Sequence, residues 1–312
     1  MKEPLIVAPL DGSELAERAL PYVSLFAKAM CGRVLLLTVW AGVFGGQNGG
    51  LARTTEGDGR DFAGRVHDYY KRYLEKTAGA LRKQRIDVAT AAIVGEIPDP
   101  AGRIVDIIRR QQASLAVLST HGRSGLSRWW YGSAADRLVR EAPAPTLVIG
   151  PGVLSAHAAV RPVRRILVPL DGSPIAEEAL PHAVTLAEAL KASLTLAQVV
   201  TPVTYLLPFP APQIDTVRID KQLVGNAERY LNRQNKRLKT QRPVNTLVVR
   251  GQPADALLAL QEKRRFDLVV MTSHTRRGVS RAFLGSVTDR VIHGPAPVLV
   301  VRPKPAAKAR RR

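Results

Sequence analysis

The chain repeats itself, and this repetition limits what it can fold into more than any other feature of the sequence. The segment 9–13, Pro-Leu-Asp-Gly-Ser, returns at 169–173, a shift of 160 residues (171 − 11). Both copies follow a short apolar run and lead into a helical pattern that carries Ala-Leu-Pro, at 19–21 and 179–181. Proline lacks an N–H, so it should bend both helices at the same place. At 312 residues and 46% hydrophobic composition, the chain is predicted to be an internal duplication of two ordinary domains.

Each half alternates predicted strands with predicted helices. The strand patterns cover 5–8, 33–39, 88–94, 115–118 and 146–149, then 166–168, 193–200, 246–249, 268–271 and 298–301. Continuous apolar runs of this kind are typical of parallel strands that are covered on both faces. We therefore expect an α/β fold of two tandem doubly wound, Rossmann-like domains, each with a five-stranded parallel sheet.

The domains are predicted at 1–150 and 166–303, with a linker over 151–165 and a basic, disordered tail over 304–312. Long helices are expected over about 61–85 and 219–239. In the first of these, five residues are spaced for one buried face: Phe62, Val66, Tyr69, Tyr73 and Leu81.

A loop with glycines follows the fourth strand of each half. In the first half it reads Ser-Thr-His-Gly-Arg-Ser-Gly over 119–125, and Gly132-Ser133 then opens a helix. Glycine lets main-chain N–H groups approach a phosphate closely, and the unpaired N–H groups of a helix start point at such an anion. The second half has Thr275 where the first has Gly122. The layout predicts an anion site at the carboxyl end of the fourth strand.

Each half resembles a universal stress protein domain, and the whole chain resembles a tandem member of that family. The family signature is Gly, two residues, Gly, nine residues, Gly, then Ser or Thr, with an Asp after the first strand. The matching positions in the first half are Ser119, Gly122, Gly132 and Ser133, with Asp11 upstream. Those in the second are Thr272, Thr275, Gly285 and Ser286, with Asp171 upstream. One signature glycine is therefore replaced in the first half and two in the second.

The resemblance implies a stress-response sensor or regulator that binds an adenine nucleotide, ATP with a divalent ion such as Mg²⁺, chiefly in its first half. No water-positioning residue is identified, so we expect no dedicated enzyme and at most slow ATP hydrolysis. In the first half the predicted contacts are Pro9, Leu10, Asp11, Val39, Ser119, His121, Gly122, Arg123, Gly132 and Ser133. In the second they are Asp171, Val199, Thr272, His274, Gly285 and Ser286.

Several of these residues have a structural alternative. Asp11 would accept hydrogen bonds from a ribose hydroxyl or an adenine amine, or else cap a helix. Arg123 suits phosphate through its fork of donors, or is simply exposed. Ser133 would bind a terminal phosphate, cap its helix, or do both. The aromatic run 129–131 would stack on a base or, as we prefer, pack against a neighbouring domain.

The formal charge of +20 favours acidic partners such as nucleotides, nucleic acid or anionic lipid, although arginines spread over many helices would give the same total. The alternative function is a non-nucleotide interaction protein whose basic surface binds nucleic acid or an acidic partner. The basic tail is expected to bind nucleic acid weakly. Six scattered histidines and the single cysteine, Cys31, support neither a metal site nor a catalytic triad.

The sequence also predicts location and assembly. No apolar stretch reaches the ~18 residues of a membrane span, and the start of the chain carries no signal-peptide pattern, so we expect a cytoplasmic protein without a membrane partner. The final strand of each half should lie at a sheet edge, which invites pairing. We expect the halves to form an internal pseudo-two-fold pair through these strands, as the family resemblance implies, and a homodimer is a further expected assembly.

Overall fold

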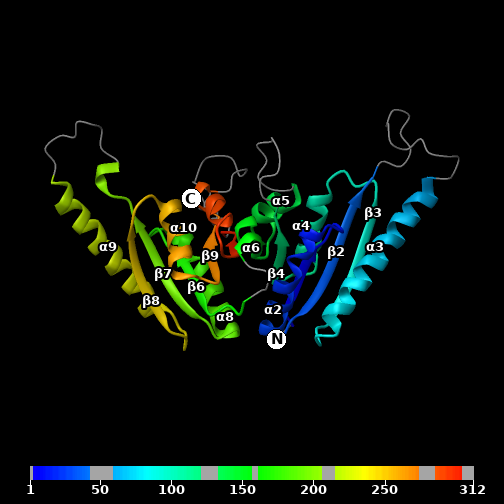
Figure 1. The fold of residues 1–312 in the computed structure, drawn as a ribbon, viewed down its shortest axis with the longest axis horizontal. Helices are drawn as coiled ribbons and strands as arrows, with labels where there is room; N and C mark the ends of the chain where they lie inside the picture. Colours follow the sequence, from blue (N-terminus) through cyan, green and yellow to red (C-terminus); the bar gives the residue numbers. More distant parts are fainter. Residues whose placement is uncertain are drawn as a thin grey trace, which may run out of the picture. The chain divides into compact units, whose positions relative to one another are not determined.

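A computed structural model describes residues 3–42, 59–120, 133–156, 161–205, 215–273 and 285–303. The chain divides into two compact units, Met1–Pro162 and Val163–Arg312. Each unit alternates strands and helices along the chain, and Figure 1 follows this order in colour. The duplication read from the sequence is thus a duplication of structure.

Unit 1 contains the first ten regular elements and a short helix before the boundary. Its strands are β1 (Leu5–Pro9), β2 (Arg33–Ala41), β3 (Val88–Gly95), β4 (Leu115–Ser119) and β5 (Thr146–Ile149). Its helices are α1 (Glu14–Glu17), α2 (Leu20–Met30), α3 (Gly59–Arg82), α4 (Pro100–Arg110), α5 (Ser133–Glu141) and α6 (Pro151–Ala156).

Unit 2 repeats the same sequence of elements. Its strands are β6 (Arg165–Pro169), β7 (Ser193–Val200), β8 (Val244–Arg250), β9 (Leu268–Thr272) and β10 (Val298–Val301). Its helices are α7 (Pro174–Glu177), α8 (Ala179–Leu190), the 3₁₀ helix η1 (Val203–Tyr205), α9 (Thr216–Arg237), α10 (Pro253–Arg264) and α11 (Ser286–Ile292).

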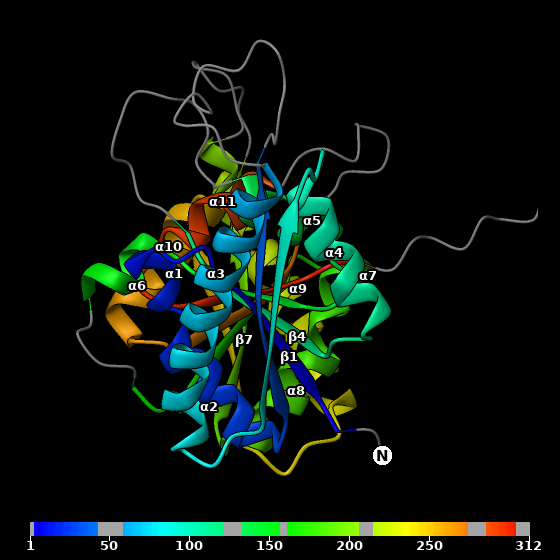
Figure 2. The same ribbon diagram turned by 90° about the vertical axis from the view of Figure 1, so that its right-hand side faces the viewer.

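Parallel strands form the centre of each unit. In unit 1 the strand order is β3-β2-β1-β4-β5, and in unit 2 it is β8-β7-β6-β9-β10. Helices cover both faces of the unit 1 strands, with α2 and α3 on one side and α4 and α5 on the other (Figure 2). The strands are largely buried Val, Leu, Ile and Ala, as expected for parallel strands covered on both faces. The predicted doubly wound, five-stranded fold is confirmed for both halves.

The helix predicted to bend at Ala-Leu-Pro is instead interrupted in both units. α1 ends at Glu17 and α2 begins at Leu20, with the proline in its first turn. α7 and α8 are separated at the equivalent place. A proline in the first turn of a helix needs no N–H donor, so the second helix starts at the proline rather than bending around it. The predicted linker also differs, because it contains α6.

The buried face predicted for α3 is confirmed only in part, with Val66 and Tyr73 half-buried. Phe62 and Tyr69 are 48% and 56% exposed, although Leu81 is buried as expected. Leu74 and Ala78 complete the buried stripe with Leu81. This stripe lies in the second half of α3, which packs against β3 and β2, whereas the ring of Phe62 contacts Trp40 edge to face, 6.4 Å between centroids. Helical spacing alone did not show where along the helix the sheet ends.

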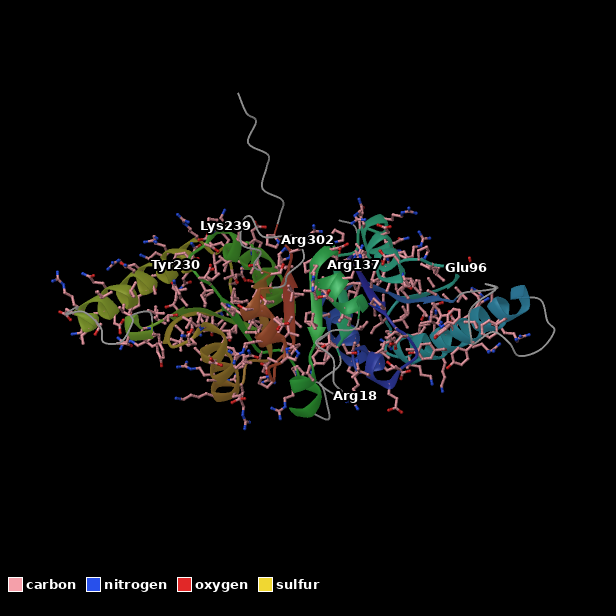
Figure 3. The ribbon with its side chains drawn as sticks, turned by 90° about the horizontal axis from the view of Figure 1, so that it is seen from above. Arg18, Glu96, Arg137, Tyr230, Lys239 and Arg302 are labelled. Carbon is pink, nitrogen blue, oxygen red and sulfur yellow. The ribbon has the colours of Figure 1, made fainter. Side chains whose placement is uncertain are left out.

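Surface ion pairs join α4 to α5. Arg137, labelled in Figure 3, pairs with Asp99 at 3.1 Å and with Glu141 at 2.7 Å. Asp99 also caps α4 by accepting a hydrogen bond from the Gly102 N–H, 2.9 Å. In unit 2 the equivalent Arg290 pairs with Asp255 of α10. The same two helices are therefore joined in both units, although the acid stands at a different position.

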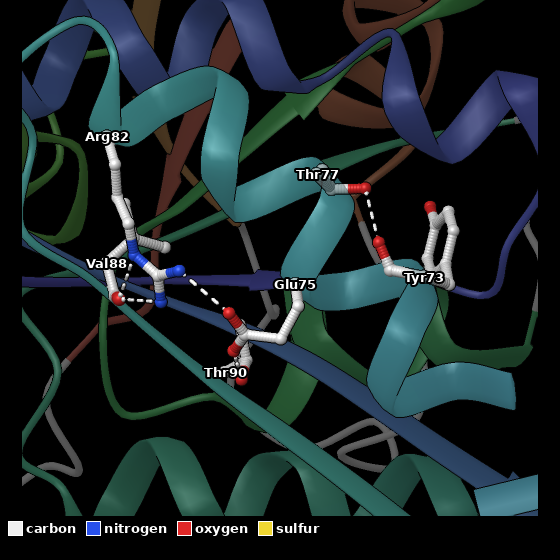
Figure 4. A network of polar contacts seen from close by, with 6 residues as sticks. All are labelled: Tyr73, Glu75, Thr77, Arg82, Val88 and Thr90. Carbon is white, nitrogen blue, oxygen red and sulfur yellow. Dashed lines mark hydrogen bonds and ion pairs between the residues drawn. The ribbon is translucent and has the colours of Figure 1, made fainter. Parts of the chain in front are cut away.

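A polar network fixes the end of α3 to β3 (Figure 4). The Arg82 guanidinium donates to the Val88 carbonyl from Nε and Nη2, at 3.2 and 2.8 Å, and to Glu75 at 2.7 Å. Glu75 also accepts from the Thr90 hydroxyl, 2.6 Å. The hydrogen bond from Arg82, followed by that from Thr90, holds the pKa of the Glu75 carboxyl below its usual range.

Candidate functional site

The strand order of unit 1 reverses between β1 and β4, and the space outside the carboxyl ends of these two strands is called the crevice below. The chain moves outward from β1 to β2 and β3, then returns to place β4 on the other side of β1. In a doubly wound sheet this reversal is where ligands bind, outside the carboxyl ends of the strands. β1 and β4 pair only through Ile6–Leu115 and Val7–Ala116, whereas β1 stays paired with β2 as far as Pro9. The two central strands therefore part before either one ends.

Pro9 supplies a physical reason for this parting. The Leu10 N–H donates to the Leu37 carbonyl on β2, 2.8 Å. Because successive residues of a strand point their N–H groups to opposite neighbours, the nitrogen of Pro9 faces the β4 side. Proline has no N–H to donate there. Unit 2 repeats the arrangement: Leu170 donates to Ala197 on β7, 2.7 Å, and Pro169 precedes it.

A tight turn carries Asp11 out of β1. The Asp11 Oδ1 accepts from the Ser13 N–H at 2.9 Å and from the Ser13 hydroxyl at 2.6 Å. Ser13 in turn caps α1 by accepting from the Ala16 N–H, 3.1 Å. Gly12 between them has a φ of +86°, which a side chain would disfavour. The helix-cap role that we had offered as the alternative for Asp11 therefore belongs to Ser13, and Asp11 is exposed at the mouth of the crevice.

The charge of Asp11 contributes to the raised pKa of two tyrosines on α3. Burial raises the pKa of the Tyr73 hydroxyl, and the neighbouring carboxylates of Glu17 and then Asp11 raise it further. Burial likewise raises the pKa of Tyr70, with smaller contributions from Tyr69 and Asp11. A phenol that stays protonated is a hydrogen-bond donor, and the Tyr70 ring lies beside the turn that carries Asp11, where a Cβ added to Gly12 would be 3.6 Å from it.

The end of β4 forms the opposite wall. The Ser119 hydroxyl donates to the Leu15 carbonyl of α1, 2.5 Å, so this predicted contact serves first to hold α1 against β4. Thr120 follows and is 1% exposed, and its N–H donates to the Ile149 carbonyl, 3.0 Å. Its hydroxyl has no hydrogen-bond partner among the residues that the structure describes. A buried unpaired hydroxyl is costly, which makes Thr120 a further candidate contact.

The floor of the crevice comes from β1 and β2. Leu10 is buried, and the Thr38 hydroxyl donates to its carbonyl, 2.7 Å. Val39 is half-buried within β2 and stands opposite Ile93 of β3, two residues before β2 ends. Pro9 and Val39 thus supply apolar surface beside Asp11. Thr38 and Thr120 were not among the contacts predicted from the sequence. The signal that could have found them is a polar residue next to or within an otherwise apolar run.

Unit 2 has the same turn with different neighbours. Asp171 accepts from the Ser173 N–H, 2.9 Å, and Gly172 has the same φ of +86°. Gln198 replaces Thr38, and its Oε1 is buried without a partner among the described residues. The carbonyl of Thr272, at the end of β9, accepts from the Thr288 hydroxyl of α11, 3.3 Å.

The remaining predicted residues of unit 2 lie on β7 and at the start of α11. Val199 is half-buried in β7 opposite Val249. Gly285 is the N-cap residue of α11 and Ser286 is its exposed first residue. The structure therefore brings Asp171 and Thr272 to the carboxyl ends of β6 and β9, with Gly285 and Ser286 at the start of the helix that follows.

Several predicted contacts lie outside the described residues, and so does the aromatic run 129–131. These contacts are His121, Gly122, Arg123, Gly132 and His274. Ser133 is the first residue of α5, so the helix start expected to face a phosphate is present in the backbone.

Two further observations concern the described ranges. Within them, no set of three or more His, Cys, Asp or Glu residues could hold a metal ion. No described helix is both long enough and apolar enough to cross a membrane.

The chain was compared with known proteins. The model of the universal stress protein family matches residues 5–150 and again 162–302. A universal stress protein of Mycobacterium bovis is 34% identical over 214 residues, covering 65% of this chain and 66% of the relative. One of Mycolicibacterium smegmatis is 33% identical over 200 residues, covering 62% and 63%. The chain thus spans slightly under two thirds of the length of these relatives.

Solved structures agree on the fold. A universal stress protein from Archaeoglobus fulgidus superposes with a TM-score of 0.68 at 19% identity, covering 97% of this chain and 99% of that one. A functionally unknown protein from Pseudomonas aeruginosa gives a TM-score of 0.64 at 16% identity, covering 96% and 93%. With two matches of the family model that together span most of its length, the chain belongs to the universal stress protein family and carries two of its domains in tandem.

Proposed function

We propose that unit 1 binds an adenine nucleotide, ATP with a divalent ion such as Mg²⁺, and that the chain acts in the stress response as a sensor or regulator. The observation that carries this proposal is the crevice between β1 and β4, with exposed Asp11 on one side and the buried, unpaired Thr120 hydroxyl on the other. A loop containing Gly122 and Gly125 follows Thr120 in the sequence, and α5 begins directly after Gly132.

The described residues fit the parts of such a ligand. Asp11 can accept from a ribose hydroxyl or a base amine through the oxygen that does not bind Ser13. Val39 and Pro9 supply apolar surface for the base. Main-chain N–H groups at the start of α5 suit a phosphate. The divalent ion would be held mainly by phosphate oxygens, as is usual for Mg²⁺ with nucleotides.

Unit 2 is expected to bind more weakly. Thr275 adds a side chain where Gly122 leaves room for the phosphates. Gln198 also places a longer side chain than Thr38 beside the turn, since a Cβ added to Gly172 would lie 3.8 Å from its Nε2. We still predict that ATP is hydrolysed slowly at most. A cytoplasmic location also remains our prediction, because the single cysteine, the exposed Cys31, cannot form a disulfide within the chain.

Isothermal titration calorimetry of the full chain with Mg·ATP tests this proposal. Gly122→Val should remove most of the binding, whereas Thr275→Val should change it little. Asp11→Asn keeps the acceptor for the Ser13 N–H but removes the charge, and it should weaken ATP about tenfold, the loss of one charged hydrogen bond. A larger effect of Thr275→Val than of Gly122→Val would assign the site to unit 2.

Mass spectrometry of ligand carried through purification gives an independent test. We expect an adenine nucleotide in wild-type protein and none in Gly122→Val. A chain that binds no nucleotide in either experiment would leave only an interaction function.

A further inference from the structure

Helix α9 carries a straight line of positive charge on its exposed side. Arg218, Arg229, Arg233 and Lys236 are all exposed. Their spacings of 11, 15 and 18 residues from Arg218 place them within about 60° around a helix of 3.6 residues per turn. At about 1.5 Å per residue, the line is roughly 27 Å long. These four residues are called the α9 stripe below.

The apolar side of α9 is already used. Ala227, Tyr230 and Leu231 are buried, and the helix packs on β8 and β7. In Figure 3, which labels Tyr230, long side chains project from α9. The exposed side between the stripe residues is polar, with Gln222 and Asn226. A helix that binds a membrane surface needs a free apolar face, so α9 does not suit that role.

The stripe is not neutralised by carboxylates. No ion pair found within the described part of the chain involves any of its four residues. Two nearby acids serve the backbone: Asp215 accepts from the Arg218 N–H and Asp220 from the Val203 N–H, both at 2.9 Å. The exposed Glu228 lies about 80° around the helix from Arg218, outside the arc of the stripe. The Arg229 guanidinium donates to the neutral Asn226 side chain. The net charge of this face is therefore available to a partner.

The matching helix of unit 1 shows that the fold does not require the stripe. Leu74 of α3 and Leu231 of α9 are equivalent buried residues, a shift of 157 (231 − 74). By this shift the four stripe positions correspond in α3 to Asp61, Arg72, Lys76 and Gly79. Only two of the four are basic and one is acidic. Unit 2 as a whole has 25 Lys and Arg against 11 Asp and Glu, a formal charge of +14, whereas unit 1 has 21 against 15, a charge of +6.

A hollow of about 600 Å³ lies along the first part of α9. Gly225 stands in its wall, where unit 1 has Asp68 at the matching position. Three cations line it, Arg218, Lys221 and Arg229, together with one acid, Asp215, whose carboxylate accepts from the Arg218 N–H. Three cations around a concave surface suit a phosphate group, and an acid in place of Gly225 would oppose it.

We propose that the α9 stripe binds the sugar–phosphate backbone of duplex nucleic acid without reading its sequence. Duplex DNA presents about one charge per 1.7 Å, so a 27 Å line faces a continuous row of phosphates. Tyr230, the one aromatic residue of α9, is buried, so the exposed side of this helix offers no ring that could stack on unpaired bases, which favours a duplex over a single strand. The proposal does not depend on nucleotide binding by unit 1.

Fluorescence anisotropy with a labelled 24-base-pair DNA duplex, over 50 to 200 mM KCl, tests the proposal on the full chain. The test variant replaces all four stripe residues: Arg218→Gln, Arg229→Gln, Arg233→Gln and Lys236→Gln. The matched control removes four exposed charges from unit 1: Lys71→Gln, Arg72→Gln, Lys76→Gln and Lys83→Gln. Circular dichroism confirms that both variants fold.

Four phosphate contacts predict a slope of about −3.6 in log K against log salt, which is roughly 150-fold between 50 and 200 mM. The stripe variant should bind at least 30-fold more weakly at 50 mM, with a slope shallower by about 3, and the control should change less than threefold. Equal losses in both variants, or a loss produced entirely by removing 304–312, would overturn the proposal. So would tighter binding to phosphatidylserine vesicles or to polyglutamate than to the duplex at the same salt.

Discussion

The two units have the same fold but differ in where they place polar groups. Their central strands are similarly apolar, and Leu74 of α3 and Leu231 of α9 are equally buried. At the carboxyl ends of the central strands, Thr38 donates to Leu10 in unit 1, whereas Gln198 leaves a buried oxygen unpaired in unit 2. The comparison indicates that the second copy kept what the fold needs while its strand ends and exposed helix changed.

A second difference lies on the helix after the third strand. Ile108 of α4 is fully buried in unit 1, and Gln261 takes its place in α10, a shift of 153 (261 − 108). Gln261 is 1% exposed, and neither end of its amide has a hydrogen-bond partner among the described residues. The flanking residues match in kind, Ile104 with Leu257. Unit 2 therefore contains a polar group in a position that unit 1 fills with hydrocarbon.

The largest effect should come from the two matched leucines. Leu74→Ala and Leu231→Ala each empty a fully buried site and should each lower the free energy of unfolding by about 3 kcal/mol. Urea unfolding followed by far-UV circular dichroism measures both. Losses that differ by more than about 2 kcal/mol would contradict the equivalence of the two cores. All three tryptophans, Trp40, Trp129 and Trp130, belong to unit 1, so a shift of the fluorescence transition in Leu231→Ala would show that the units unfold together.

Substitutions at the matched positions 108 and 261 should have opposite effects on the stability of the protein. Ile108→Gln loses apolar burial and adds an unpaired amide, which should cost about 2 to 3 kcal/mol. Gln261→Met keeps the shape of the side chain and removes the unpaired amide, so it should stabilise the protein by about 1 kcal/mol. Thermal unfolding of the two variants against wild type is the measurement. If Gln261→Met is destabilising, the Gln261 amide makes a hydrogen bond in the folded protein.

The glycines of the two turns should respond alike. Gly12→Ala and Gly172→Ala each force a side chain to a φ of +86°, at a cost of about 1 kcal/mol. In Gly12→Ala the Cβ of the alanine would lie 3.6 Å from Tyr70, which is an ordinary contact, so the loss of stability comes from backbone strain. Chemical denaturation gives the stability change. We also expect Gly12→Ala to weaken ATP because the turn positions Asp11, and unchanged affinity would argue against that role.

The smallest effect concerns pH. The pKa of Glu75 is lowered from its ordinary 4.5, so its stabilisation is complete above that value and is lost as the pH falls through the lower, folded-state pKa. Unit 2 has the neutral Asn232 at the matching position. Glu75→Asn should cost less than about 0.5 kcal/mol at pH 7, because the pair is exposed and solvent screens it. The difference from wild type should shrink as the pH is lowered below 4.5 in urea titrations, and a difference that stays constant over the whole acid range in which the protein remains folded would contradict it.

Most of the fold could be predicted from the sequence because its signals are local. Continuous apolar runs marked the strands, and the repeated turn with Asp11 and Asp171 fixed the register of the duplication. The bounds of β5 and β10 were predicted correctly. What failed depends on distant contacts. Phe62 and Tyr69 have helical spacing, but only the position of the sheet decides which turns of α3 are covered.

The site was predicted in outline only. The sequence placed Asp11 and Ser119 at strand ends, but it could not show that the Ser119 hydroxyl is already bound to the Leu15 carbonyl. Nor could it show the buried, unpaired hydroxyl of Thr120, because hydrogen-bond partners come from other elements. The pairing of the halves through their final strands stays a prediction, which the tryptophan measurement on Leu231→Ala addresses.

The entirely parallel pairing within each unit also bears on how the chain folds. Neighbouring parallel strands are joined by long crossovers, so each ladder forms only after a large loop has closed, and such topologies fold slowly. In this chain the central strands β1 and β6 have similar sequences, Leu-Ile-Val-Ala-Pro and Arg-Ile-Leu-Val-Pro, with the same apolar centre and the same final proline. During the slow search, β6 is therefore a close competitor for the place of β1 between β2 and β4. Folding of the first half before the second is synthesised removes that competitor, since domains emerge and fold from the N-terminus.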